Sequence, residues 1–265
     1  MLDTAAYETI RIDKRDDGVA VCTLNRPERL NAVNSAMHRE LANLPRDIQN
    51  DTTVRAALLR GEGRAFCAGG DFGGAADEPM GSRGGGLMEE ARRIVDHLLE
   101  CEKPIVSAVR GPAMGLGATI ALLCDVVVAG ESAFFADTHV KMGIGAGDGG
   151  QLIWPFLVGV NRAKFFLMTG DRVPAVEAER IGLVNFVVPD DELDTRALEI
   201  ATRLASGPSV AIAASKVAIN TWLRQVSATI MPISLGREIA CFGTEDNIEA
   251  VKAFQEKREP NFRGR

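Results

Sequence analysis

Three short, nearly continuous apolar runs constrain the fold of this chain more than any other feature. They are VRAALLRG at 54–61, PIVSAVRG at 104–111 and CDVVVAG at 124–130. A strand covered on both faces gives such a run, whereas a strand with one wet face alternates apolar and polar residues. Helical segments separate the runs, so we expect largely parallel strands joined by right-handed crossovers. The sequence therefore predicts an α/β protein.

The regions on either side of these runs follow other patterns. Alternating residues around Asp17-Gly18 predict a β-hairpin within 7–26. The spacing in 35–51 predicts a helix with Ser35 as its N-cap and a kink or break at Pro45. The pattern after residue 207 is helical. We therefore expect an α/β core over 1–207 and a helical region over 208–265 that packs subunits together.

Charge and hydropathy exclude several classes of function. The 265-residue chain has a net charge of −6 with scattered Lys and Arg, which argues against a nucleic-acid partner. The apolar stretch at 117–130 contains Asp125 and is too short to cross a bilayer. The N-terminus lacks the pattern of a signal peptide, so we expect a cytoplasmic protein. The three histidines have no metal-ligand spacing, and the five cysteines are typical of buried free thiols.

Two glycine-rich turns follow apolar runs. FCAGGDF spans 66–72, and RGPAMGLGATIALL spans 110–123 and opens a helix. Glycine lets backbone N–H groups approach a ligand, and a helix N-terminus adds a partial positive charge. Two such turns from neighbouring strands would direct two N–H donors at one oxygen, so we interpret them as an oxyanion hole. The glycine-rich stretch at 73–86, directly after the first turn, is interpreted as a lid.

The ordered motifs along the chain resemble the crotonase superfamily of enoyl-CoA hydratases and isomerases. The resemblance rests on LNRPERLNAVNSAM (24–37), GRAFCAGGDF (63–72), KPIVSAVRGPAMGLGATIALLCDVVVAGESAFFA (103–136), LMTGDRVPAVEAERIGLVNFVV (167–188) and EAVKAFQEKREPNF (249–262). It implies a spiral of ββα units with a helical C-terminal region, assembled as trimers or dimers of trimers. It also implies that the backbone N–H groups of Gly70 and Leu116 hold a thioester oxygen as it becomes an enolate.

The same resemblance implies an acyl-CoA substrate and no separate cofactor. The residues that fall on the coenzyme A path are Arg29, Leu30, Ala32, Ala68, Asp71 and Phe72. Lys257, with Arg258, would supply positive charge to phosphates. Met142, together with the side chains of Leu116 and Phe72, would line a hydrophobic acyl pocket.

The chain departs from the hydratases at their two catalytic glutamates. Counted from Cys124-Asp125, those positions hold Thr119 and His139. Threonine is no general base at neutral pH, so proton transfer needs other groups. His139 titrates near neutrality, and Asp148, beyond a glycine-rich bend, is expected to fix its tautomer.

His139 and Asp148 also resemble a pair in a branch of the superfamily, the β-diketone hydrolases, which cleave carbon–carbon bonds. Glu238 falls where that branch has a later glutamate, and His38 is a further possible match. The β-diketone hydrolases have another pocket histidine where this chain has Leu116. Their substrate chemistry therefore cannot be assigned to this chain in full. Each of these residues could instead have a purely structural role. Asp148 could be a helix N-cap, Glu238 an exposed charge, and His38 a peripheral residue.

Three functions remain open at this point. The preferred one is a CoA-thioester hydratase, isomerase or lyase in which His139 and Asp148 replace the glutamate pair. The second is a retro-Claisen hydrolase of a β-diketone or 3-oxoacyl substrate. The third is a catalytically silent CoA-binding protein.

Overall fold

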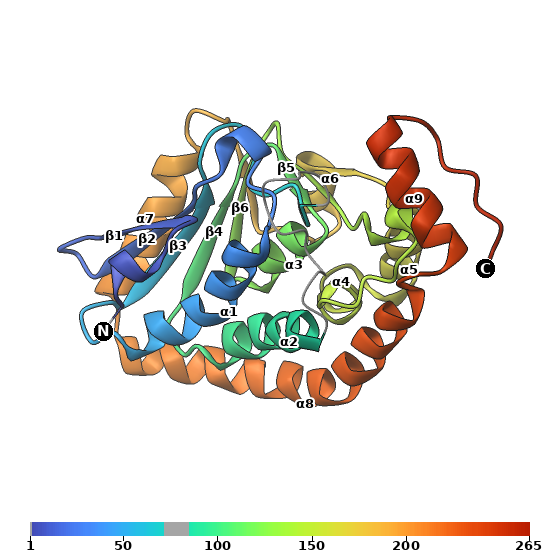
Figure 1. Cartoon of the computed structure of the whole chain (residues 1–265). Helices are drawn as coiled ribbons and strands as arrows, with labels where there is room; N and C mark the ends of the chain where they lie inside the picture. The colour runs from blue at the N-terminus through green and yellow to red at the C-terminus, as the bar shows by residue number, and fades with distance from the viewer. Residues whose placement is uncertain (1, 72–84) are drawn as a thin grey trace.

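The chain folds around one large sheet, seen in the left half of the computed structural model in Figure 1. The structure describes residues 2–71 and 85–265. Within these residues, six strands form the sheet in the order β1-β2-β3-β4-β6-β9. Their bounds are β1 Ile10–Lys14, β2 Val19–Leu24, β3 Ala56–Gly61, β4 Ile105–Val109, β6 Val126–Gly130 and β9 Phe186–Val188. β1 and β2 are antiparallel and all other neighbours are parallel, which confirms the predicted hairpin and the predicted parallel strands.

A second, smaller sheet leads to the candidate site. Among the described residues it contains β5 (Pro112–Met114), β7 (Phe134–Ala136) and β8 (Val173–Pro174), in that order. β5 leads directly to the second glycine turn and to helix α3 (Leu116–Leu123). β7 ends just before His139, which begins the short 3-10 helix η3 (His139–Met142). Both short strands therefore end at residues that the sequence assigned to the site.

Both faces of the large sheet are covered, as its apolar runs predicted. One face packs on α7 (Leu193–Ser206), which presents Leu193, Ala197, Ala201 and Ala205 at a spacing of one helical turn. The other face packs on the main core, to which α1 (Ser35–Asn50), α2 (Gly85–Glu100) and α3 contribute. Neighbouring residues of β3 divide between the two faces: Leu58 faces α7 and Leu59 faces the main core. The remaining helices of this layer are α4 (Gly150–Val158), α5 (Val160–Thr169) and α6 (Ala175–Arg180).

Helix α1 differs from its prediction at both Ser35 and Pro45. The N-cap is Asn34, whose side chain accepts from the N–H of Met37 at 3.0 Å, and Ser35 is the first helical residue. The helix runs through Pro45 without interruption. Leu41, Leu44 and Ile48 of the same helix are buried. We attribute the continuity to this packing, which offsets the one backbone hydrogen bond that proline removes.

The C-terminal region is helical, in agreement with the sequence. It consists of α8 (Ser209–Cys241) and α9 (Glu245–Glu256), followed by an extended tail. Figure 1 shows α8 running beside α2 and then curving upward towards α9, with α4 and α5 on the inside of the curve. The C-terminal region therefore packs on the core of its own chain on one side, and its other side is an outer surface.

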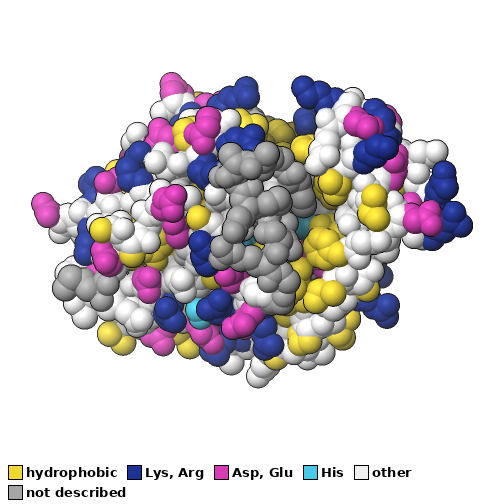
Figure 2. Space-filling view, viewed as in Figure 1, with side chains coloured by type: hydrophobic (Ala, Val, Ile, Leu, Met, Phe, Trp, Pro, Cys, Tyr) yellow, Lys and Arg dark blue, Asp and Glu magenta, His cyan; other side chains and the backbone are white. Residues whose placement is uncertain are grey.

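The surface seen in Figure 2 mixes charges of both signs. Basic and acidic side chains lie interspersed on this face, and hydrophobic side chains gather at the right, on the C-terminal side of the molecule. In the part of the chain that the structure describes, no helix has both the length and the hydropathy that a membrane crossing requires. Of the predicted lid, residues 73–84 lie outside the described residues, and Gly85 begins α2.

Candidate active site

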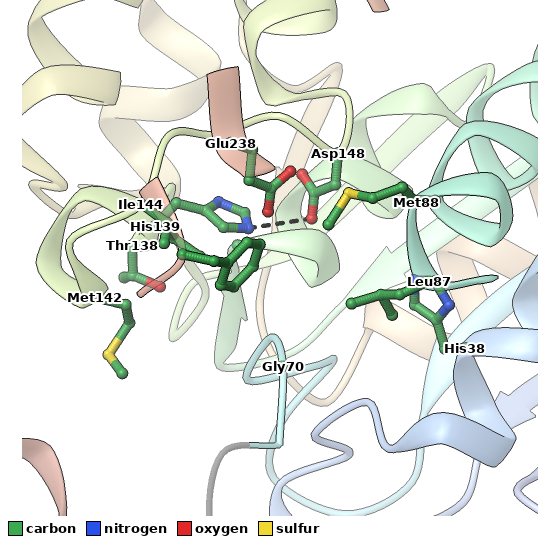
Figure 3. A pocket seen from close by; sticks show the side chains of 13 residues that line it. His38, Gly70, Leu87, Met88, Thr138, His139, Met142, Ile144, Asp148 and Glu238 are labelled. Carbon is green, nitrogen blue, oxygen red and sulfur yellow. Dashed lines mark ion pairs between the residues drawn. The ribbon is translucent and has the colours of Figure 1, made fainter. Parts of the chain in front are cut away.

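A small inner pocket collects acid–base residues from distant parts of the chain. Its volume is about 40 Å³, which is more than one water molecule needs. Its polar lining includes His38 from α1, His139 from η3, Asp148 from the loop before α4, and Glu238 from α8. Figure 3 shows the carboxylates of Asp148 and Glu238 side by side next to the His139 ring. The structure thus brings together the three predicted catalytic residues, and it adds His38.

His139 lies between two carboxylates, one at each ring nitrogen. Its Nδ1 is 2.6 Å from Oδ1 of Asp137, and its Nε2 is 3.1 Å from Oδ2 of Asp148. The second contact is the dashed line in Figure 3. The His139 side chain is only 9% exposed and that of Asp137 is fully buried. The sequence predicted Asp148 as the partner that fixes the tautomer, whereas Asp137 occupies the Nδ1 side.

The sequence analysis missed Asp137 because its signal is weak. It lies two residues before His139, and side chains at this spacing face each other only when the backbone turns. The turn is present here: the backbone N–H of His139 also donates to Oδ1 of Asp137, at 3.4 Å. An aspartate two residues before a candidate histidine, at the end of a strand, was the only available clue.

Asp148 belongs to the pocket and is no helix cap. Helix α4 begins at Gly150 with Gly149 in the N-cap position and no side-chain capping bond. Besides the contact with His139, the Thr119 hydroxyl lies 3.4 Å from Oδ1 of Asp148. Thr119, which stands at one of the missing glutamate positions, therefore contacts the aspartate.

The glycine-rich bend permits close packing around these carboxylates. A Cβ on Gly147 would lie 2.3 Å from Oε2 of Glu238 and 2.9 Å from the carbonyl oxygen of Ser234, so α8 rests directly on this backbone. A Cβ on Gly150 would lie 2.2 Å from Oδ2 of Asp137. Real Cβ atoms do not approach so closely. The bend is therefore a packing device that lets Glu238 and Asp137 reach their places.

Glu238 is a buried acid with an unpartnered oxygen. It is 5% exposed, and its Oε2 has no hydrogen-bond partner among the described residues. Burial, and next the negative charge of Asp148, raise the pKa of Glu238 to about 8. At neutral pH Glu238 is therefore protonated and has a proton to donate.

His139 and Asp148 stabilise each other's charged form. Burial by itself would lower the pKa of His139, but the carboxylates of Asp148 and Asp137 outweigh it and raise that pKa well above the usual value. Burial acts to raise the pKa of Asp148, and the positive His139 more than offsets it, so that pKa is lowered. Near neutrality the pocket holds an imidazolium beside the Asp148 carboxylate, with neutral Glu238 next to them.

The two glycine turns adjoin each other, as predicted. The backbone N–H of Cys67 donates to the carbonyl of Pro112 at 3.0 Å, and that of Met114 donates to the carbonyl of Cys67 at 2.9 Å. The N–H groups of Gly70 and Leu116 make no hydrogen bond to any described residue. Gly70 lines the inner pocket, whereas the Leu116 side chain belongs to the main core and is not among the residues that line this pocket.

A wider outer groove of about 650 Å³ adjoins the inner pocket and shares Gly70, Thr138 and Met142 with it. Of the predicted coenzyme A residues, those that line the groove are Arg29, Leu30, Ala32, Ala68 and Asp71, together with Met142. Arg64 and Lys141 add positive charge to the lining. Asp71 is buried and pairs with Arg26 at 3.1 Å and with Arg29 at 3.4 Å.

Two predicted groove residues are not found in this lining. Phe72 lies outside the described residues. Lys257 is the exposed residue that ends α9, and it does not line the groove; α9 contributes Phe254 instead. Arg258, just beyond the end of α9, pairs with Glu249 and Glu256 of that helix. Among residues 2–71 and 85–265, no group of three or more His, Cys, Asp or Glu side chains is arranged to hold a metal ion.

Comparisons with known proteins agree on one family. The family model described as enoyl-CoA hydratase/isomerase matches residues 14–265. A short-chain-enoyl-CoA hydratase of Clostridium acetobutylicum is 38% identical over 92% of this chain and 94% of its own length. A 1,2-epoxyphenylacetyl-CoA isomerase of Escherichia coli is 35% identical over 94% of this chain and 97% of its own. A crystal structure of an enoyl-CoA hydratase from Mycobacterium avium subsp. paratuberculosis has a TM-score of 0.89 at 31% identity and covers 97% of this chain and 99% of that one.

Proposed function

The chain belongs to the enoyl-CoA hydratase/isomerase family of the crotonase superfamily, and we propose that it hydrates or isomerises an enoyl-CoA thioester with His139, Asp148 and Glu238 as its acid–base groups. Family membership establishes an acyl-CoA enzyme and confirms the predicted fold class. The observation that carries the finer proposal is the meeting of these three residues in one pocket, at a site without the usual glutamate pair.

The oxyanion hole is the first part of the proposed mechanism. Attack on an enoyl thioester, or removal of a proton next to it, places negative charge on the thioester oxygen. The unpaired N–H groups of Gly70 and Leu116, on adjoining turns, are the donors we assign to that oxygen. Leu116 also begins α3, whose partial positive charge would add to the stabilisation.

Proton transfer is the second part. The Asp148 carboxylate, hydrogen-bonded to the His139 imidazolium, is the basic group of the pocket and would accept the proton from water or from the substrate carbon. Neutral Glu238, whose pKa of about 8 keeps it protonated, would donate a proton to the enolate carbon. Asp137 holds the Nδ1 side of the ring, so that Nε2 stays directed at Asp148.

Substrate placement follows from the continuity of the two cavities. Coenzyme A would lie in the outer groove, where Arg29, Arg64 and Lys141 can contact phosphates. The acyl group would pass Met142 and Gly70, which line both cavities, and reach His139. This path places the thioester next to Gly70.

The test is turnover of crotonyl-CoA, a longer 2-enoyl-CoA, a 3-oxoacyl-CoA and a cyclic β-diketone by wild type and by His139→Ala. We expect enoyl-CoA turnover in wild type and a loss of about 10²–10⁴-fold in the variant. His97→Ala is the matched control, because His97 lies outside the pocket and bonds the carbonyl of Ala42. Equal activity of wild type and His139→Ala would remove His139 from the mechanism. Retention of free CoA without turnover of any substrate would point to a silent binding protein.

A second candidate is a carbon–carbon hydrolase of a β-diketone or 3-oxoacyl substrate. The contact of His139 with Asp148, and Glu238 in the same pocket, favour it, because these residues resemble those of the diketone hydrolases. In this reaction the same oxyanion hole would hold the enolate that leaves. Cleavage of a diketone that lacks CoA, abolished in His139→Ala, would select this function.

We also propose that the protein is a homotrimer or a dimer of trimers and acts in the cytoplasm. Helices α8 and α9 leave Trp222, Ile233 and Ile248 exposed, and subunit contacts would cover these apolar side chains. The molar mass measured by light scattering separates a monomer, a trimer and a hexamer.

A further inference from the structure

A second buried histidine, His38, lines the inner pocket and plays no part in the mechanism above. It is 1% exposed, and its Nδ1 lies 2.8 Å from Oε2 of Glu90 on α2. This is the only hydrogen bond that its ring makes to a described residue, so Nε2 has no partner among them. Because His38 lines the pocket, Nε2 is available to a group that enters it.

Glu90 determines what kind of partner fits. An ionised carboxylate only accepts hydrogen bonds, so Nδ1 of His38 carries the proton that is shared with Glu90. The other nitrogen, Nε2, accepts a hydrogen bond in the neutral ring and donates one in the charged ring. A hydroxyl can either donate or accept, so it can pair with Nε2 in both forms.

The surroundings of His38 further restrict the ligand. Leu87, Met88 and Ala91 of α2 line the same part of the pocket, so the rest of the ligand there is apolar. Figure 3 shows Leu87 next to His38, Met88 next to Asp148, and His139 on the opposite side of the pocket. Glu90 and Asp148 are acidic neighbours that would repel a carboxylate. A hydroxyl on an otherwise apolar chain meets all of these conditions.

We propose that the enzyme acts on acyl thioesters whose acyl group carries a hydroxyl at the end remote from the thioester, and that Nε2 of His38, oriented by Glu90, forms a hydrogen bond with that hydroxyl. This inference rests on the proposed function, since it assumes that the acyl group enters past Gly70 and His139. His38 is the specificity residue and Glu90 is a positioning residue that acts through it.

The experiment compares pairs of 2-enoyl-CoA substrates of four, five and six acyl carbons, each with and without a terminal hydroxyl. At the length that reaches His38, we expect wild type to prefer the hydroxylated member by about three- to tenfold in kcat/KM, the effect of one hydrogen bond. His38→Leu should reduce that ratio to about one. His38→Gln, which keeps an acceptor near the Nε2 position, should restore part of it.

Glu90 variants separate a positioning role from a merely structural one. Glu90→Gln keeps an acceptor for Nδ1 and should preserve the preference for hydroxyl while improving turnover of a chain that ends in a carboxylate. Glu90→Leu removes the acceptor and should lower the preference. Thermal unfolding of each variant identifies any loss that comes only from weaker packing of α1 on α2, because such a loss would affect both members of a pair equally.

The outcomes distinguish this inference from the proposed function. Crotonyl-CoA turnover with no preference for hydroxyl at any length overturns the inference and leaves the proposed function standing. If no enoyl-CoA is turned over, the proposed function fails, and competition binding of saturated acyl-CoA thioesters with and without the hydroxyl decides the inference. Equal affinities in that assay overturn it.

Discussion

His139 and His38 line opposite sides of one pocket, and their carboxylate partners differ. Both side chains are buried, but His139 has a carboxylate at each ring nitrogen and His38 has one at Nδ1 alone. With both nitrogens engaged, the His139 ring is held as an imidazolium. With only Nδ1 engaged, His38 keeps Nε2 available for a ligand. The comparison teaches that the number of carboxylates, rather than burial, separates a group suited to proton chemistry from one suited to recognition.

The two sites also differ in their further neighbours. Glu238, an acid with an unpartnered oxygen, lies beside His139, whereas the apolar side chain of Leu87 lies beside His38. A proton donor next to a base can catalyse proton transfer, while a histidine next to an apolar group is suited to binding. Three sets of substitutions test this contrast.

The largest effect is expected from the same chemical change at the two carboxylates. Asp148→Asn removes the proposed base and should lower kcat on crotonyl-CoA by about 10²–10⁴-fold. Glu90→Gln makes the equivalent change at His38 and should leave crotonyl-CoA turnover within about twofold, because this short acyl group needs no partner there. Similar losses in the two variants, measured by steady-state kinetics, would remove the distinction between the histidines.

The next effect concerns Glu238 and has a pH signature. Because its pKa is raised to about 8 and its protonated form is the donor, wild-type kcat should fall as pH rises through about 8. Glu238→Gln should lower kcat by about tenfold or more and remove this alkaline limb. The raised pKa of Glu238 also affects stability. Between about pH 4.5 and pH 8 the folded protein keeps a proton on Glu238 that the unfolded chain has lost, so the free energy of unfolding of wild type should decrease over this range. An alkaline limb that persists in the variant would assign it to another group.

The smallest of the three effects is expected at Asp137, the second carboxylate of His139. Asp137→Asn should lower the pKa of His139 towards its usual value, because one of the two charges that raise it is gone. We expect kcat to fall by about tenfold. The alkaline limb assigned to Glu238 should move to lower pH, because the charge of Asp137 also raises the pKa of Glu238. Ring ¹⁵N shifts of His139 followed through a pH titration measure the pKa directly. Asp51→Asn is the control, since Asp51 is also fully buried but pairs with Lys14 away from the pocket; it should reduce stability without moving the titration of His139.

Much of the fold could be predicted because its signals are local. The apolar runs predicted parallel strands covered on both faces, and Leu58 and Leu59 do divide between two cores. At Pro45 the local prediction of a break failed. The helix continues because α1 packs on the core along its length, and this stabilisation depends on residues distant in the sequence.

The candidate site was predictable in part for the same reason. The glycine turns and His139 belong to sequence motifs, and the order of these motifs along the chain was enough to predict them as site residues. Asp137 was missed because a spacing of two residues brings side chains together only in a particular turn, and Glu90 because it comes from another helix, 52 residues away. Lys257 was placed on the groove by its charge and position, yet the end of α9 directs Phe254 there instead.

The sequence by itself determined the family, the α/β class and the absence of the usual glutamates, because these depend on residue identity and order. Only the tertiary structure decided which carboxylate meets which ring nitrogen and that Glu238 is a buried acid. The physical reason is that hydrogen bonds and pKa shifts act over a few ångströms, and residues such as Asp148 and Glu238 become neighbours only when α8 packs on the backbone of Gly147.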